Sequence, residues 1–191
     1  MIGIRKTAVT TAVMAVAALA FTASPASAVD ATDSHANARV EQEVQAVLRL
    51  NPGSHRVAPN VVEVDEGVTI SVPTQINDIQ NCKTSYLCLS EHANFGGHQI
   101  SFWKCRDVNL GYYKLPDGRT WNDQVSSIRN AQSRGVQSRF YNYDGSGDPD
   151  SPSNWRFVIA LNAGHYLRDL SRDTSADGGY ANDKIDIVHV C

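Results

Sequence analysis

The fold is decided by two related stretches, Trp121-Asn-Asp-Gln-Val-Ser-Ser-Ile-Arg-Asn130 and Ala181-Asn-Asp-Lys-Ile-Asp-Ile-Val-His-Val190. Each has an Asn-Asp pair, one variable residue and then an apolar residue that begins a strand-like run, and the offset between them is 60 residues. A repeat of this size is typical of a duplicated supersecondary unit whose copies bury their apolar faces together. The sequence therefore predicts two related halves in the C-terminal part of the chain.

Short strand patterns surround the two stretches and are separated by Gly, Asn, Asp and Ser. Alternating apolar residues with regular turn signals are typical of an antiparallel sandwich. Residues 144–154 are rich in Gly, Asp, Ser and Pro, so we expect them to form an exposed loop. The predicted strands are residues 86–89, 98–102, 125–129, 138–141, 157–161, 166–170 and 185–190.

The first 28 residues resemble a secretory signal peptide. Arg5 and Lys6 precede an Ala- and Val-rich apolar run, and Ala26-Ser27-Ala28 provides a cleavage site. The apolar run is too short for a comfortable membrane span. We therefore expect a secreted, extracellular protein without a membrane partner.

Loss of the signal peptide removes two basic residues and no acidic ones, which lowers the formal net charge from −3 to −5. Nucleic acids and anionic lipids bind proteins through dense positive charge. The acidic mature chain argues against both as main partners.

Residues 29–73 differ in sequence pattern from the short strands of the C-terminal part. Residues 29–37 are polar, and we expect them to be disordered. Residues 38–50 show helical spacing of Val40, Val44, Val47 and Leu48, with Asn37 as a possible cap and residues 51–53 as the stop. Alternating valines on either side of residues 65–67 predict a hairpin over residues 62–72. This helix and hairpin could be a cleavable pro-segment or an N-terminal extension, followed by a linker at 74–81 and a β domain at 82–191.

The four cysteines, Cys82, Cys88, Cys105 and Cys191, are an even number in an exported chain, which indicates two disulfides. Sequence alone allows three pairings. We favour Cys82–Cys88, a small staple at the start of the domain, and Cys105–Cys191, which ties the last residue to the first repeat. A zinc site is disfavoured because the spacing matches no Cys-x-x-Cys knuckle.

The segment Ser90-Glu-His-Ala-Asn-Phe-Gly-Gly-His-Gln-Ile100 resembles the first hairpin of a βγ-crystallin Greek-key motif, with Phe95 and Gly97 in the aromatic-x-Gly corner. Asn122-Asp-Gln-Val-Ser-Ser127 is similar to the calcium signature of that superfamily. Residues 82–191 most resemble the secreted actinobacterial peptidase inhibitors with this fold. The resemblance implies a mainly β, two-Greek-key sandwich, here preceded by the helix and hairpin. The chain departs from the pattern at Ser90, Asp186 and Ile187.

The resemblance also implies calcium as a cofactor. Ca²⁺ takes about 6–8 oxygen ligands from carboxylates, carbonyls, hydroxyls and water. The alternative is that each Asn-Asp pair ends a loop before a strand and that Ser126 and Ser127 bond to the backbone. Ile187 cannot replace the terminal Ser of the second signature. The candidate ligands are Asn122, Asp123, Gln124, Ser126, Asn182, Asp183, Lys184 and Asp186.

The function implied by the resemblance is inhibition of an extracellular peptidase, with a metallopeptidase favoured. Such an inhibitor presents a rigid loop, so that little entropy is lost on binding. The first candidate loop, residues 109–120, has apolar anchors that a thermolysin-like pocket could accept, and the acidic loop 144–154 has none. Packing beneath the loop is the alternative role for the two tyrosines. The candidate inhibitory residues are Leu110, Tyr112, Tyr113 and Leu115.

Enzymatic activity is not indicated. The sequence contains neither Gly-x-Ser-x-Gly nor His-Glu-x-x-His. The rival functions are a calcium-stabilised extracellular stress module and a wall- or glycan-binding module that uses the aromatic side chains of Trp103, Trp121 or Trp155. Because the duplicated repeat completes one sandwich, we expect a monomer.

Overall fold

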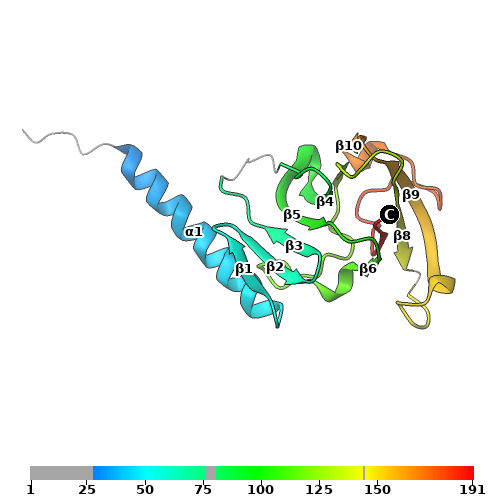
Figure 1. Cartoon of the computed structure of the whole chain (residues 1–191), viewed down its shortest axis with the longest axis horizontal. Coiled ribbons are helices and arrows are strands. Elements are labelled where there is room, and N and C mark those ends of the chain that lie inside the picture. Colours follow the sequence, from blue (N-terminus) through cyan, green and yellow to red (C-terminus); the bar gives the residue numbers. More distant parts are fainter. Residues whose placement is uncertain (1–27, 76–80, 144) are drawn as a thin grey trace, which may run out of the picture.

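The computed structural model describes residues 28–75, 81–143 and 145–191 (Figure 1). Within these residues one α-helix precedes two antiparallel sheets, so the predicted mainly β class is confirmed. No helix in this part of the chain is long and apolar enough to cross a membrane. The predicted signal peptide lies outside the described residues except for Ala28, and most of the predicted linker, residues 76–80, also lies outside them.

Helix α1 spans Ala28–Leu50 and begins ten residues before the predicted start. The expectation of disorder over residues 29–37, with Asn37 as a cap, is therefore wrong. Residues 28–37 contain neither Gly nor Pro, so a helix anchored by the buried Val44 and Val47 can propagate toward the N-terminus. This first part of α1 extends away from the sheets in Figure 1, and Ser34, His35 and Asn37 are exposed.

The larger sheet has seven strands in the order β1-β2-β3-β5-β4-β7-β10. The smaller sheet has the order β6-β11-β8-β9. Most strands lie within two residues of the prediction, but β1 and β6 were not predicted, and β10 is only two residues long because a 3₁₀ turn follows at Leu170–Arg172. The strands are β1 His55–Ala58, β2 Val61–Asp65, β3 Val68–Ser71, β4 Leu87–His92, β5 Gly96–Phe102, β6 Asp107–Asn109, β7 Ser127–Asn130, β8 Gln137–Tyr143, β9 Trp155–Asn162, β10 Tyr166–Leu167 and β11 Ile187–His189.

The two repeats exchange one strand each. Strand β6 comes from the first repeat but pairs with β11 of the second, and β10 comes from the second repeat but pairs with β7 of the first. The exchange makes the two halves of the sandwich depend on each other for their edges. The 3₁₀ turn Ala93–Phe95 joins β4 to β5, and Gly97 at the start of β5 has a φ of +74°. A Cβ atom there would lie 2.9 Å from the His92 ring. Both the positive φ and this close approach therefore require glycine at this position.

The N-terminal segment, defined as residues 28–73, is part of the same sheet as the β domain. The whole length of β3 pairs with β5, with Ile70 opposite Ile100. Val44 and Val47 of α1 are fully buried with the sheet residues in one apolar core. Removal of the segment would leave β5 as an exposed edge. Residues 28–73 are thus joined to the β domain by one continuous sheet and one apolar core.

Two disulfides stabilise the sandwich, and they join the pairs that the sequence favoured. Cys82–Cys88 holds the segment before β4 against that strand. Cys105–Cys191 connects positions 86 residues apart and joins the chain before β6 to the C-terminal residue. No free cysteine occurs among the described residues.

Candidate functional site

The Asn-Asp loops, defined as residues 121–126 and 181–186, lie against each other with reciprocal contacts. The N–H of Asp123 donates to the carbonyl of Ile185 (3.4 Å), and the N–H of Asp183 donates to the carbonyl of Val125 (3.3 Å). Asp123 and Asp183 both have left-handed backbones, with φ of 55° and 53°. The two stretches recognised in the sequence therefore meet about a local two-fold axis.

A carboxylate pair at this junction has the character of a cation site. Asp186 is only 5% exposed, and its Oδ1 has no hydrogen-bond partner among the described residues. Burial raises the pKa of Asp186 to about 6, and the negative charge of Asp123 adds to this, although the backbone N–H of Tyr143 opposes it. The buried Oδ1 of Asn122 is likewise without a partner in this part of the chain. The unpaired buried oxygen of Asp186, which feels the charge of a second carboxylate, fits the oxygen preference of calcium.

The other predicted ligands are less suited to hold an ion with their side chains. The Gln124 amide bonds to Arg119 and to backbone carbonyls, and the Lys184 ammonium bonds to Asp177 and to the Gly178 carbonyl. The Asn182 amide donates to Asp183 (2.6 Å). No group of three or more His, Cys, Asp and Glu side chains that could hold a metal occurs in the described residues. Backbone carbonyls and water would have to complete any calcium shell.

Ser127, which follows the first Asn-Asp loop, has a structural role within the calcium-like signature. The Ser127 hydroxyl donates to the carbonyl of His92 (2.7 Å) and accepts from the N–H of Phe95 (3.0 Å). It thus fastens the β4–β5 hairpin to β7. Ile187, at the equivalent position of the second repeat, is buried and can make no such bonds. This outcome matches the alternative of backbone bonding at Ser127.

The candidate inhibitory residues lie in the Tyr112 turn, defined as residues 109–115. Three of the four anchors expected there, Leu110, Tyr113 and Leu115, are buried in the core, so the expectation that they contact a peptidase is wrong. All three belong to the apolar core that the sheets share with α1. Tyr112 alone is exposed, at 62% of its surface.

The acidic loop supports Tyr112 from one side. Asp150 accepts hydrogen bonds from the Tyr112 hydroxyl and from the Asn109 amide (3.0 Å). The other amide atom of Asn109 accepts from the N–H of Gly111 (2.9 Å) and so caps the 3₁₀ turn Leu110–Tyr112. The two loops that the sequence treated separately therefore form one surface.

The N-terminal segment supports the same turn from the other side. The Asn51 side chain accepts from the N–H of Lys114 (2.8 Å) and donates to its carbonyl (3.0 Å), and it is buried. The Tyr113 hydroxyl donates to Asp65 (3.0 Å), which also pairs with Arg106 (2.7 Å). Nothing in the sequence marks Asn51 or Asp65 for this role, since both read as ordinary helix-stop and turn residues.

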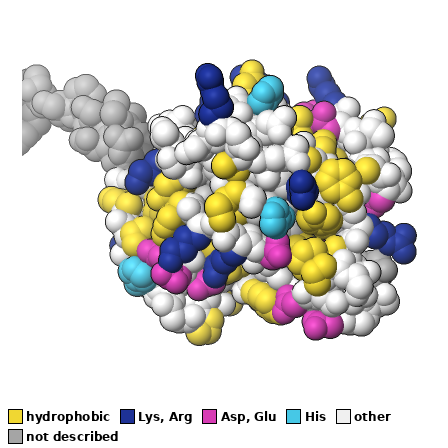
Figure 2. All heavy atoms as spheres, turned by 45° about the vertical axis from the view of Figure 1, so that its right-hand side comes forward, with side chains coloured by type: hydrophobic (Ala, Val, Ile, Leu, Met, Phe, Trp, Pro, Cys, Tyr) yellow, Lys and Arg dark blue, Asp and Glu magenta, His cyan; other side chains and the backbone are white. Residues whose placement is uncertain are grey.

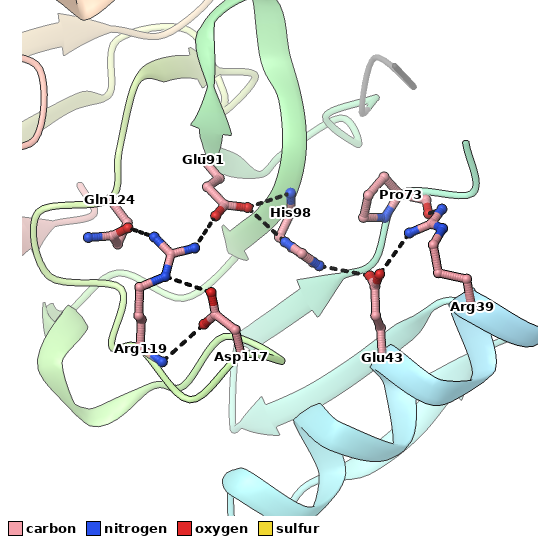
Figure 3. A network of polar contacts seen from close by, with 8 residues as sticks. All are labelled: Arg39, Glu43, Pro73, Glu91, His98, Asp117, Arg119 and Gln124. Atoms are coloured by element: carbon pink, nitrogen blue, oxygen red, sulfur yellow. Dashed lines mark hydrogen bonds and ion pairs between the residues drawn. The ribbon is translucent and has the colours of Figure 1, made fainter. Parts of the chain in front are cut away.

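A polar network forms a third connection between the N-terminal segment and the first repeat (Figure 3). His98 on β5 lies between Glu91 on β4 (2.7 Å) and Glu43 on α1 (3.0 Å). Glu43 also pairs with Arg39 (2.9 Å). Glu91 continues to Arg119 (2.7 Å), which bonds to Gln124 of the first Asn-Asp loop. The network thus runs from the helix to the Asn-Asp loop.

The charges of this network are mutually stabilising. Burial works to raise the pKa of Glu91, but the hydrogen bonds from His98 and Arg119 outweigh it and hold this pKa at about 2. Burial works to lower the pKa of His98, but its hydrogen bonds with Glu91 and Glu43 raise it above the ordinary value. Protonated His98 and ionised Glu91 therefore favour each other in the fold.

Exposed aromatic residues are dispersed over the molecule. Tyr112, Phe157, Tyr166 and Tyr180 are the large exposed ones in the described part of the chain, and Trp121 is fully buried. On the face seen in Figure 2, hydrophobic side chains lie in small groups between charged ones. This face presents no single extended apolar patch, so a contact surface here would depend on individual side chains.

Comparison with known proteins connects this geometry to a family. Residues 75–149 match the model described as "Peptidase inhibitor family I36". A solved structure titled "Evolution of the eye lens beta-gamma-crystallin domain fold" is similar at 21% identity and a TM-score of 0.41, covering 65% of this chain and 96% of that chain. Spherulin 3A from Physarum polycephalum is similar at 19% identity and a TM-score of 0.37, covering 60% of this chain and 91% of that chain. The comparison with curated proteins finds no match.

The matched segment contains β4 to β8, and with them the Tyr112 turn and the first Asn-Asp loop. The described residues form two antiparallel sheets, which agrees with the predicted mainly β sandwich. Residues 75–149 of this chain are therefore similar to peptidase inhibitor family I36.

Proposed function

We propose that the protein is secreted and inhibits an extracellular peptidase by docking the Tyr112 turn in the active-site cleft. The match of residues 75–149 to a peptidase inhibitor family supports a peptidase as the partner. The observation that carries the proposal is the contrast within the turn, where Tyr112 is exposed while Leu110, Tyr113 and Leu115 are buried on either side of it. A side chain held in this way loses little conformational entropy on binding.

The bracing of the turn strengthens the proposal. Asp150 fixes the hydroxyl of Tyr112, Asn51 fixes the backbone of Lys114, and Asp65 fixes the ring of Tyr113. Tyrosine is enriched among residues that dominate binding energy at protein interfaces. Preorganisation from both the acidic loop and the N-terminal segment is what a tight inhibitor requires.

The chemistry of Tyr112 favours one kind of peptidase. A trypsin-like pocket selects a basic side chain by means of a buried carboxylate, which Tyr112 cannot satisfy. A pocket that accepts large apolar side chains, as in thermolysin-like metallopeptidases, suits its ring. We therefore propose a metallopeptidase as the target.

The test is an activity titration of a thermolysin-type, a subtilisin-type and a trypsin-type peptidase with the purified protein. The proposal predicts a stoichiometric loss of the thermolysin-type activity and unchanged trypsin-type activity. Inhibition of the subtilisin type alone would keep the inhibitory function but overturn the metallopeptidase target. Full activity of all three enzymes at a large excess of protein would contradict inhibition of these peptidase types.

A second candidate function is a calcium-stabilised extracellular module, and a specific observation favours it. The Oδ1 of Asp186 is buried without a partner among the described residues and feels the charge of Asp123, so a cation would relieve the desolvated carboxylate. Affinity in the micromolar-to-millimolar range is typical of extracellular calcium modules. A rise in melting temperature with calcium but not with magnesium would support this function, and an unchanged melting temperature would contradict it.

A further inference from the structure

The outer face of the larger sheet carries a groove of about 450 Å³ that the inhibitor proposal does not use. Its floor is polar. Thr69 on β3 lies opposite Ser101 on β5, and Ser71 lies opposite Gln99. The Gln99 side chain bonds to the hydroxyls of Ser101 (3.2 Å) and Ser90 (3.4 Å), which orders the floor.

An aromatic wall closes one side of the groove. The rings of Tyr86 and Trp103 pack at a centroid distance of 5.2 Å with an interplanar angle of 40°. The Cys82–Cys88 disulfide ties the segment that carries Tyr86 to β4, which pairs with β5. Val57, Ala58 and Val61 of the β1–β2 edge also line the groove. The floor and its β1–β2 edge thus include residues of the N-terminal segment, while the aromatic wall belongs to the β domain.

From this geometry we infer that the groove binds a neutral saccharide, with one pyranose ring packed against Trp103. Hydroxyl and amide side chains both donate and accept hydrogen bonds, as the hydroxyls of a sugar do. The ring hydrogens of a pyranose form an apolar face that suits an aromatic wall. A volume of about 450 Å³ lies within the usual range of about 300–1,000 Å³ for small-molecule sites.

The charges around the groove disfavour an anionic ligand. Lys83 is the one cation among its described lining residues, and its ammonium lies 5.4 Å above the Tyr86 ring. Glu63 adds an opposing charge to the same lining. Phosphate and carboxylate ligands are usually held by several cations or by bidentate Arg. A neutral ligand fits this balance.

Saccharide binding is separate from the proposed inhibition. The residues that line this groove include none of the Tyr112 turn. The two proposals can therefore fail independently: loss of sugar binding leaves peptidase titration unchanged, and loss of inhibition leaves sugar binding unchanged.

The test is isothermal titration of the purified protein with the trimers of N-acetylglucosamine, β-1,4-glucose and β-1,3-glucose. We expect at least one of them to bind, and Trp103→Ala to weaken that binding by about tenfold or more through loss of the aromatic contact. Ser71→Leu, which places an apolar side chain at the half-buried position of an otherwise buried floor, should abolish binding while the wall remains. Thr69→Val, which removes a hydroxyl at nearly constant shape, should weaken binding by a smaller factor.

Trp155→Ala is the matched control because Trp155 is half-buried on the smaller sheet and does not line the groove. It should bind the sugar as the wild type does. The proposal is overturned if none of the trimers binds at millimolar concentration, or if binding survives both Trp103→Ala and Ser71→Leu in variants that retain the wild-type melting transition. It is also overturned if inorganic phosphate displaces the bound sugar and Lys83→Ala abolishes the effect.

Discussion

The two repeats have the same backbone and different surfaces. In the first repeat the N–H of Tyr113 donates to the Leu110 carbonyl, and in the second the N–H of Asp173 donates to the Leu170 carbonyl. Asn109 caps the first 3₁₀ turn and Asp169 caps the second with the same side-chain contact. A duplicated unit has therefore kept its main-chain hydrogen bonds in both copies.

The side chains of the two turns differ in a consistent way. The first turn presents Tyr112, with apolar Leu115 and Trp121 buried beneath it. The second turn has Arg172 at the equivalent position, followed by Asp173 and Ser175. Among the described contacts, Asn51 and Asp65 of the N-terminal segment reach the first turn. We infer that the second repeat serves mainly as scaffold. The turn of the first repeat is held in place by the N-terminal segment and presents an exposed side chain.

The largest effect should come from unlinking the repeats. Cys105→Ser with Cys191→Ser opens a loop of 86 residues and should lower the free energy of unfolding by about 4–5 kcal/mol in the loop-entropy model. Cys82→Ser with Cys88→Ser opens a loop of 6 residues and should cost about 2 kcal/mol. Urea unfolding of the two double variants measures the difference. Equal losses would show that the repeats do not depend on their covalent link.

Removal of a brace should loosen the first turn alone. Asn51→Ala leaves the half-buried N–H and carbonyl of Lys114 without their side-chain partner and should cost about 1–2 kcal/mol. Amide hydrogen exchange should accelerate at Tyr113 and Lys114 but not at the equivalent Asp173 and Thr174. Acceleration of the same size in both repeats would contradict a brace that acts on the first turn.

The network around His98 adds a pH dependence to the same asymmetry. The folded-state pKa of His98 is raised, so the stabilisation by its charge is complete below its ordinary value of 6.5 and is lost as the pH rises through the folded value. His98→Gln should lower the free energy of unfolding by about 1–2 kcal/mol in mildly acidic buffer and by less in alkaline buffer. Glu91 has the opposite sign, because its contribution is present above its ordinary value of 4.5 and is lost as the pH falls through about 2.

Thermal unfolding from mildly acidic to alkaline pH, above the range in which Glu91 titrates, isolates the contribution of His98. The control is His165→Gln, since His165 is exposed in the second repeat. A His98→Gln variant whose deficit grows with rising pH would contradict the assignment of a protonated His98 between the two glutamates.

The smallest effect concerns the Asn-Asp loops. Asp186→Asn removes a buried charge whose Oδ1 lacks a partner and should raise the free energy of unfolding without calcium by about 1 kcal/mol. The same change should abolish any rise in melting temperature that calcium produces. Ser126→Ala, at the equivalent position of the first repeat, should change the calcium-free stability less. Retention of the full calcium effect in Asp186→Asn would show that Asp186 is not a ligand.

Much of the fold could be predicted because its determinants are local. Alternating valines predicted the hairpin of β2 and β3, and the Asn-Asp stretches predicted two related halves. Strand β6 escaped notice because three residues carry too little periodicity. The helix start was missed because polar residues without Gly or Pro can continue a helix that begins elsewhere.

The candidate site could be predicted only in part. Spacing identified Asn122, Asp123 and Asp186, whose environment depends on the meeting of the repeats. Which residue of the Tyr112 turn is exposed depends on tertiary packing against the core, and a 3₁₀ turn has no regular pattern that separates Tyr112 from Tyr113. Asn51 and Asp65 form hydrogen bonds with residues about 50 to 60 positions away in the sequence, so no local sequence pattern could predict these contacts.

The central claim is that the braced Tyr112 turn contacts the peptidase. The most direct measurement is the inhibition constant of Tyr112→Ala against the peptidase that the wild type titrates, with Arg172→Ala as the matched control at the equivalent position of the second repeat. The Arg172 side chain is 85% exposed, so its loss should not disturb the fold. The account predicts that Tyr112→Ala weakens inhibition by about 2–4 kcal/mol, or about 30-fold to 1,000-fold, while Arg172→Ala inhibits as the wild type does. Equal inhibition by wild type and Tyr112→Ala would contradict it.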